Sequence, residues 1–153
     1  MPPDNPDSPK VVLPDVRSLG IHHQPLILVA DDEVLLRNLV VLLMQGEGFV
    51  VLASADGREA LELSRKYPGT IDLVITDMEM PRMKGTDLCA HLLEERPGIQ
   101  VLVMSGDINQ IAGKNMNLPF LPKPFDGETL KARVWALLFP GRASTSTQGQ
   151  SGK

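Results

Sequence analysis

The feature of the sequence that most constrains the fold is the alternation of two kinds of segment. Short, apolar, β-branched runs are typical of buried strands, and they alternate with longer runs whose apolar residues recur at helical spacing. The expected strands are residues 26–30, 49–53, 71–75, 99–104 and 120–121. The expected helices are residues 33–45, 54–66 and 86–95 and a last helix capped by Asp126. This alternation predicts a doubly wound parallel sheet with helices on both faces.

The most informative stretch, IDLVITDMEMPRMKG, runs from Ile71 to Gly85. Its first half predicts a buried strand, and Asp77 stands where that strand should end. Pro81 cannot continue a central strand, because it has no N–H for the ladder, and Gly85 allows a tight turn before the next helix. Open α/β sheets place their sites beside the carboxyl ends of strands, so we interpret Asp77 as a site residue.

Polar residues follow three further strands: Asp31 and Asp32, Ser105, and Lys123. In a parallel sheet these strand ends share one edge with Asp77. Three carboxylates placed together repel one another, and a hard divalent cation such as Mg²⁺ relieves that repulsion. A carboxylate can attack phosphorus, while a lysine and a hydroxyl can bind phosphoryl oxygens. The set therefore indicates phosphoryl transfer onto Asp77.

Composition excludes several other classes of protein. The 153-residue chain has a net charge of −4 at pH 7, whereas nucleic-acid surfaces are normally basic. Its single cysteine, Cys89, rules out an intrachain disulfide and is expected to pack as an inert apolar residue. No apolar run reaches the ~18 residues of a membrane span, and no signal-peptide pattern is present. We expect a cytoplasmic protein that binds neither nucleic acid nor a membrane.

The sequence divides into three parts. Residues 1–25 contain six of the 13 prolines and are expected to form a disordered, Pro-rich arm. Residues 26–140 carry all the expected strands and helices and form the predicted domain. Residues 141–153 form a polar tail that is also expected to be disordered.

Four motifs, in this order and spacing, resemble the receiver domain of two-component response regulators: ILVADDE, LVITDMEMPRMKG, VLVMSG and LPKPF. The resemblance covers roughly residues 26–139. It implies a flavodoxin-like, five-stranded parallel sheet with strand order 2-1-3-4-5. It also implies a stand-alone receiver, or the receiver of a hybrid histidine kinase.

The resemblance also assigns the acidic residues. Asp77 matches the phosphoacceptor, Asp32 the direct ligand of Mg²⁺ (or Mn²⁺), and Asp31 the acid that binds the metal mostly through water. Glu79 matches the position whose backbone carbonyl completes the metal site. Read alone, Asp77 is also consistent with a turn former, and Asp31 and Asp32 with a helix N-cap pair.

The remaining assignments lie on the last two strands. Ser105 matches the hydroxyl that moves on activation, and Lys123 matches the phosphate-binding lysine. Phe120 matches the aromatic residue that changes rotamer on activation, although it is also consistent with a plain core residue. Pro124 matches a proline preceded by a cis peptide bond, which we predict here.

One stretch departs from the family pattern. Lys123 lies only 18 positions after Ser105, which is fewer than usual, and Gly113, Asn115 and Asn117 disfavour a helix. We therefore predict that the fourth helix is short, irregular or absent, and that residues 106–118 are the most mobile part of the domain.

These features together predict a phosphorelay receiver. A histidine kinase or histidine phosphotransfer protein would donate the phosphoryl group, and the modified receiver would act on an unknown downstream protein. We expect no turnover of a separate substrate, although the receiver would assist its own phosphorylation and dephosphorylation. The alternatives are a phosphorylation-independent scaffold and an aspartate-based phosphatase, which usually has a second Asp where this chain has Glu79.

The first helix carries more apolar residues than one buried face requires. The surplus is consistent with scattered surface residues, but it also suggests a surface where the phosphoryl donor docks. Val34 and Val41, seven residues apart, are predicted to form the apolar stripe of that surface.

Overall fold

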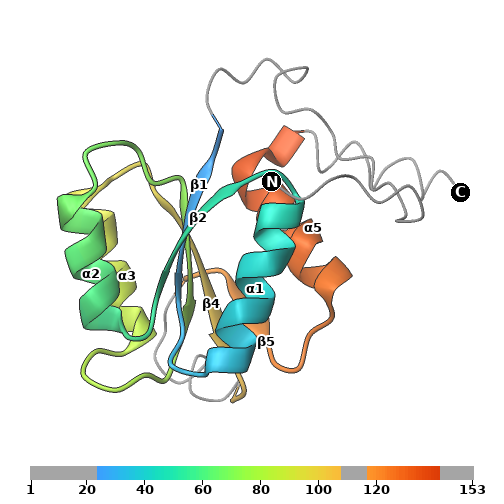
Figure 1. Cartoon of the computed structure of the whole chain (residues 1–153), viewed down its shortest axis with the longest axis horizontal. Coiled ribbons are helices and arrows are strands. Elements are labelled where there is room, and N and C mark those ends of the chain that lie inside the picture. Colours follow the sequence, from blue (N-terminus) through green and yellow to red (C-terminus); the bar gives the residue numbers. More distant parts are fainter. Residues whose placement is uncertain (1–23, 108–116, 142–153) are drawn as a thin grey trace, which may run out of the picture.

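The computed structural model describes residues 24–107 and 117–141, in which five strands form one parallel sheet (Figure 1). The strands are β1 (Leu26–Ala30), β2 (Val50–Ser54), β3 (Leu73–Asp77), β4 (Gln100–Ser105) and β5 (Phe120–Pro122). The helices are α1 (Val34–Gly46), α2 (Gly57–Lys66), α3 (Gly85–Glu95) and α5 (Gly127–Leu138). The strand order is β2-β1-β3-β4-β5, which confirms the predicted doubly wound, flavodoxin-like sheet.

The helices cover the sheet in two pairs, with α2 and α3 on one face and α1 and α5 on the other (Figure 1). Alternate residues of β1 divide between the two faces: Leu28 belongs to the core cluster that includes Ala60 of α2 and Leu88 of α3, whereas Val29 belongs to the cluster that includes Val40 of α1. All five residues of β1 and of β3 are buried, as expected of central strands in a parallel sheet.

Two predicted boundaries were wrong by more than one residue. The second helix was expected to begin at Ser54, but Ser54 ends β2 and α2 begins at Gly57. The cause is Asp56, whose carboxylate accepts a hydrogen bond of 2.8 Å from the Glu59 N–H and so caps the helix. The central strand ends at Asp77, as predicted, but it begins at Leu73 rather than at Ile71.

Several other predictions concern residues outside the described part of the chain. The proposed irregular fourth helix falls mainly on residues 108–116, and the predicted arm and tail fall mainly on residues 1–23 and 142–153. Within the predicted arm, Pro25 is described, and its carbonyl accepts a 3.0 Å hydrogen bond from the Val50 N–H. Among the helices of residues 24–107 and 117–141, none has the length and apolar character needed to span a membrane. Cys89 is buried, and burial raises the pKa of its thiol to about 12, consistent with an inert core residue.

Candidate functional site

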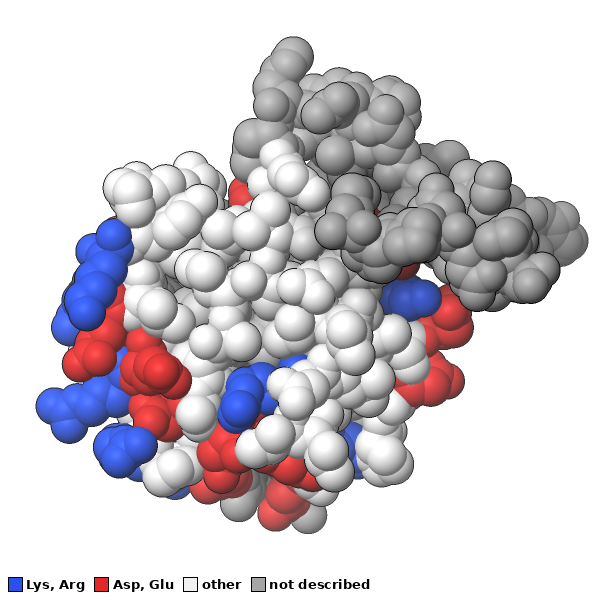
Figure 2. Space-filling model, in the orientation of Figure 1, with Lys and Arg blue, Asp and Glu red and all other residues white. Residues whose placement is uncertain are grey.

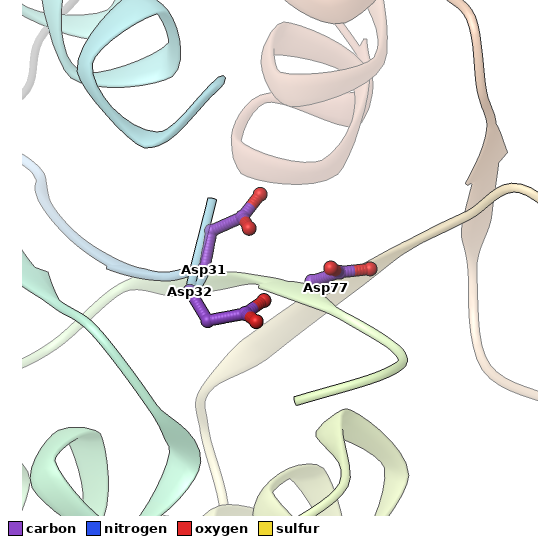
Figure 3. Close-up of side chains that lie close together, drawn as sticks. All are labelled: Asp31, Asp32 and Asp77. Atoms are coloured by element: carbon purple, nitrogen blue, oxygen red, sulfur yellow. The ribbon is translucent and has the colours of Figure 1, made fainter. Parts of the chain in front are cut away.

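Asp31, Asp32 and Asp77 meet at the carboxyl edge of the sheet (Figure 3). One carboxylate oxygen from each residue lies within 4.8 Å of the others. The register of the sheet produces this meeting, because Ala30 of β1 is paired with Thr76 of β3, and the next residue in each strand direction is an aspartate. The sequence-based prediction that these three acids converge is therefore confirmed.

Asp31 is fully buried, and its two carboxylate oxygens are in different situations. Oδ1 accepts a 2.9 Å hydrogen bond from the Glu33 N–H, whereas Oδ2 is buried and has no hydrogen-bond partner among the described residues. Burial raises the pKa of the Asp31 carboxyl to about 6; the Glu33 N–H opposes the shift and the charge of Asp77 adds to it. A buried anionic oxygen without a partner is suited to a hard cation, so the donor set fits Mg²⁺.

The N-cap interpretation of Asp31 and Asp32 is not supported. The N-cap position of α1 is Glu33, and its side chain makes no capping hydrogen bond. Asp32 is the exposed member of the cluster, while the Asp31 carbonyl accepts a 2.9 Å hydrogen bond from the Arg37 side chain. The two acids therefore face the cluster instead of the first turn of α1.

Asp77 is also buried, and it has a cationic partner. The Lys123 Nζ lies 3.2 Å from the Asp77 Oδ1, so a lysine that follows β5 reaches the end of β3. Burial raises the pKa of the Asp77 carboxyl, and the Lys123 ammonium and a hydrogen bond from the backbone N–H of Glu79 oppose that rise. Asp77 is thus held between an ammonium, an amide and two further carboxylates.

The remaining predicted residues surround this cluster. Ser105 is buried at the end of β4, one residue after Met104, which is paired with Asp77. Its hydroxyl donates a 3.0 Å hydrogen bond to the Asp107 carbonyl and accepts one of 3.0 Å from the Asp107 N–H. Phe120 is half-buried against the core cluster beneath α2 and α3, so the core interpretation describes its present position. The predicted cis peptide bond between Lys123 and Pro124 is confirmed.

The sequence analysis missed an ion pair beside the site. The Arg82 Nη2 lies 2.6 Å from the Asp56 Oδ2, which joins the loop after β3 to the start of α2. The pattern that could have located Asp56 is an acid followed three residues later by Glu59, whose carboxylate accepts a hydrogen bond from the Ala55 N–H. Nothing local marks Arg82, because its partner lies 26 residues away in the sequence.

Comparison with known proteins agrees with this geometry. The family model for the response regulator receiver domain matches residues 27–135. The chain belongs to the response regulator receiver domain family. Receiver domains bind Mg²⁺ in an acidic pocket, and the described part of this chain contains an acidic cluster of Asp31, Asp32 and Asp77.

Individual relatives and solved structures show the same likeness. The receiver is 35% identical over 123 residues to the alkaline phosphatase synthesis transcriptional regulatory protein SphR of Synechococcus elongatus. That alignment covers 73% of this chain and 48% of SphR, so the chain spans about half the length of that relative.

Two solved receivers align with most of the described chain. The receiver domain of the hybrid histidine kinase CckA is 36% identical, with a TM-score of 0.60 and coverage of 74% of this chain and 98% of that one. The response regulator TrrA of Thermotoga maritima, solved in complex with Mg²⁺-BeF, is 27% identical, with a TM-score of 0.65 and coverage of 75% and 100%. These likenesses confirm the predicted family.

Proposed function

We propose that this receiver accepts a phosphoryl group on Asp77 from a phosphohistidine donor, a histidine kinase or a histidine phosphotransfer protein, as part of a phosphorelay. The observation that carries the proposal is the position of Asp77 within 4.8 Å of two further carboxylates and 3.2 Å from the Lys123 ammonium. A carboxylate nucleophile, a cation site and a fixed positive charge are the groups that phosphoryl transfer needs, because the reaction depends on positioning and charge neutralisation.

The transfer exchanges one bond to phosphorus for another. An Asp77 carboxylate oxygen forms the new P–O bond while the P–N bond of phosphohistidine breaks, and the electron pair of that bond stays on the histidine nitrogen. Lys123 neutralises charge on the phosphoryl oxygens. Asp31 and Asp32 would hold Mg²⁺ (or Mn²⁺) together with Asp77 and the Glu79 backbone carbonyl. A cation held there would supply further charge neutralisation for the transfer.

The response to phosphorylation is proposed to begin at Ser105. Its hydroxyl is bonded to the backbone of Asp107, and an acyl phosphate on Asp77 offers stronger, charged acceptors one strand away. Movement of the hydroxyl towards the phosphoryl group would release Asp107 and allow the half-buried Phe120 to change rotamer. The population then shifts to a state with an altered protein-interaction surface, which a downstream protein recognises.

The phosphoryl donor is proposed to dock on α1, which begins beside the acidic cluster. The predicted stripe through Val34 and Val41 needs correction, because Val41 is half-buried and packs against the core. The exposed apolar residues are instead Leu35 (81%), Leu39 (48%) and Leu42 (66%), together with Val34. Figure 2 shows a largely uncharged area on this face of the molecule. Leucines spaced by four and three residues suit packing against a partner helix.

Mass measurement after incubation with acetyl phosphate or phosphoramidate tests the phosphoacceptor. We expect one phosphoryl group per molecule, no labelling in the presence of EDTA, and no labelling of Asp77→Asn. The exposed acid Asp87 of α3 provides the control, because Asp87→Asn should label like the wild type. Equal labelling of Asp77→Asn would contradict the assignment.

The same samples test the two alternative functions. Repeated turnover of a phosphate ester would favour a phosphatase, in which Glu79 would have to serve as the second acid. A chain that takes no label from either small donor while remaining folded would favour a phosphorylation-independent scaffold.

Transfer from a phosphorylated histidine phosphotransfer protein tests the docking surface. Leu35→Asp and Leu42→Asp should slow transfer from the protein donor while leaving labelling by acetyl phosphate unchanged, because small donors need no docking surface. The control is Leu93→Asp on α3, a residue that is 36% exposed on the opposite face of the sheet. Transfer that is indifferent to both α1 substitutions would exclude this surface.

A further inference from the structure

The loop that follows Asp77 contains an unusual turn at Arg82. Its φ is 72°, and Arg82 is the one non-glycine residue in the described part of the chain with positive φ. The Met83 N–H donates a 2.8 Å hydrogen bond to the Pro81 carbonyl, which closes a three-residue γ-turn with Arg82 at its centre. Turns of this kind are rare and strained, so they persist only where the surroundings hold them.

The Arg82 side chain supplies one part of that support. Its Nε and Nη2 donate hydrogen bonds of 3.2 and 2.6 Å to the Asp56 Oδ2. The other carboxylate oxygen of Asp56, Oδ1, caps α2 through the Glu59 N–H at 2.8 Å. Both interactions lower the pKa of Asp56, so this buried carboxylate is ionised at neutral pH. One carboxylate thus fastens the start of α2 and the loop after β3 to each other.

Packing supplies the other part. A Cβ added at Gly57, the first residue of α2, would lie 2.8 Å from the Met83 carbonyl oxygen and 3.0 Å from the Met83 Cβ. The loop therefore lies directly on the first turn of α2, in a space that only glycine leaves open. Asp56 and Gly57 are consecutive at the start of α2, and Arg82 and Met83 are consecutive in the loop. The ion pair and the packing contact therefore hold the same part of the loop.

The segment between Asp77 and this anchor contains Glu79. Met78 is fully buried and Met80 is 8% exposed, so the two residues that flank Glu79 are fixed in the core. The Glu79 N–H opposes the rise in the pKa of the Asp77 carboxyl, as a nearby backbone donor does, and Glu79 follows Asp77 by only two residues, so its backbone lies beside the acidic cluster. Because Arg82 lies only three residues after Glu79, a change in the turn at Arg82 would be transmitted to the Glu79 backbone through a short segment.

We propose that Asp56 and Arg82 are positioning residues for the metal site. They hold the γ-turn, and through it the Glu79 backbone, in the place that the cation needs before any cation binds. This inference rests on the proposed function, because the Glu79 carbonyl acts there as a metal ligand. It adds a pair of residues that contact neither the cation nor the phosphoryl group.

If the Asp56–Arg82 pair only stabilised the fold, its loss should have the same effect on Mg²⁺ binding as the loss of another ion pair of α2. Arg65 donates hydrogen bonds of 3.1 and 2.7 Å to the two carboxylate oxygens of Glu95, and so links α2 to α3. The Arg65 side chain is 54% exposed and that of Arg82 is 63% exposed, so solvent screens the two guanidinium groups to a similar degree. Arg65→Ala is therefore the matched control for Arg82→Ala.

The test measures Mg²⁺ binding by calorimetry and amide exchange of residues 78–84 in metal-free protein. Arg82→Ala should raise the Mg²⁺ dissociation constant about tenfold, the usual effect of removing a group that orients a ligand, and should speed exchange in the loop. Arg65→Ala should change neither quantity. Arg82→Lys should restore part of the affinity, because it keeps the positive charge opposite Asp56.

Two further variants separate the ion pair from its surroundings. Asp56→Asn keeps an efficient N-cap for α2 but loses the charge that binds Arg82, and it should also weaken Mg²⁺ binding. Arg82→Gly removes the steric strain of the positive φ along with the side chain, so an affinity as low as that of Arg82→Ala would show that the ion pair is what matters.

Wild-type affinity in Arg82→Ala, or an equal loss in Arg65→Ala, would overturn the inference. Failure of the proposed function is distinguishable, because it would appear as wild-type protein that binds Mg²⁺ but takes no label from acetyl phosphate. If both proposals hold, the Mg²⁺ concentration that gives half-maximal labelling rises in Arg82→Ala by the same factor as the dissociation constant, and excess Mg²⁺ restores labelling.

Discussion

The chain leaves the sheet beside the acidic cluster after β3 and again after β4, and the two segments are held in different ways. After β3, the Met78 N–H bonds to the Met104 carbonyl, the Gly85 N–H returns to the Met78 carbonyl, and Arg82 bonds to Asp56 of α2. After β4, the Ser105 hydroxyl bonds to the backbone of Asp107, only two residues away. The first segment is fastened to distant parts of the fold, whereas the hydroxyl of the second is held by local bonds.

This difference separates the two tasks that are proposed for this small site. Cation binding needs ligands whose positions are set in advance, and the β3–α3 loop is anchored accordingly. A response to phosphorylation needs at least one group that can exchange its partner at little cost, and a hydroxyl in a local turn satisfies that need. We expect substitutions on the anchored side, the β3–α3 loop, to have the largest effects, and a substitution on the exchangeable side, the Ser105 hydroxyl, to have the smallest effect.

The largest effect is expected from Gly85→Ala. A Cβ at Gly85 would overlap the carbonyl oxygen of Asp77 and lie 2.9 Å from its carbonyl carbon. These are backbone atoms of a buried strand, so no side chain can rotate away to relieve the overlap. We expect the free energy of unfolding to fall by about 3 kcal/mol or more, measured by urea denaturation. Gly98→Ala is the control, because a Cβ at Gly98 meets nothing within 4 Å.

Next in size is the effect of Lys123→Ala on labelling by acetyl phosphate. The substitution removes the ammonium that lies 3.2 Å from the Asp77 carboxylate and that is proposed to bind the incoming phosphoryl oxygens. We expect the labelling rate to fall by roughly tenfold or more, because no other cationic side chain is paired with Asp77 in the described residues. Lys131→Ala, which disrupts a pair with Glu47 on the α1–α5 side, should leave the rate unchanged. A wild-type rate in Lys123→Ala would show that the ammonium has no part in transfer.

The acidic cluster was predictable from sequence because it depends on the sheet alone. Once β1 and β3 are neighbouring parallel strands, Asp31 and Asp77 must meet, whatever the loops do. The Asp56–Arg82 pair was not predictable in this way, because it depends on where α2 begins and how the loop turns at Arg82. A start of α2 predicted at Ser54 placed Asp56 inside the helix and concealed its role as a cap.

The exposed apolar residues of α1 illustrate a second limit of prediction from the sequence. Sequence periodicity indicates that α1 has more apolar residues than one face needs, but it cannot say which of them the sheet covers. Val41 packs against the core because of how α1 lies across β1 and β2, and this leaves Leu35, Leu39 and Leu42 outside. The presence of surplus apolar residues was therefore predictable from the sequence, whereas their identity depended on how α1 packs against the sheet.

A smaller effect, on stability, is expected from Asp31→Asn in metal-free protein. The pKa of Asp31 is raised to about 6 in the folded protein and is near 3.8 when exposed, so ionisation disfavours the folded state. The stabilising contribution of the protonated form is complete below about pH 4 and is lost as the pH rises through 6. At pH 7 we therefore expect Asp31→Asn to be more stable than the wild type by about 1 kcal/mol, because the unpaired amide offsets part of the gain.

Urea denaturation in EDTA between pH 4 and pH 8 measures this effect. The advantage of Asp31→Asn should shrink as the pH falls below 6, and Mg²⁺ at pH 7 should stabilise the wild type more than the variant. An advantage that does not depend on pH would show that the buried carboxyl is not its source. The outcome shows whether the acidic cluster beside the anchored loop is held in a costly, charged state that a cation would relieve.

The smallest effect on labelling itself is expected from Ser105→Ala, which tests the exchangeable side. The hydroxyl bonds to Asp107 before phosphorylation and is proposed to bond to the phosphoryl group afterwards, so its loss removes the response more than the chemistry. We expect acetyl phosphate to label Ser105→Ala at a rate within about threefold of the wild type, in keeping with one neutral hydrogen bond. Addition of beryllofluoride and Mg²⁺ should change amide exchange around Phe120 in the wild type and in Ser105→Thr, which keeps a hydroxyl, but much less in Ser105→Ala. A full exchange response in Ser105→Ala would mean that the signal leaves the site by another route, and the anchored loop after β3 would then be the next segment to examine.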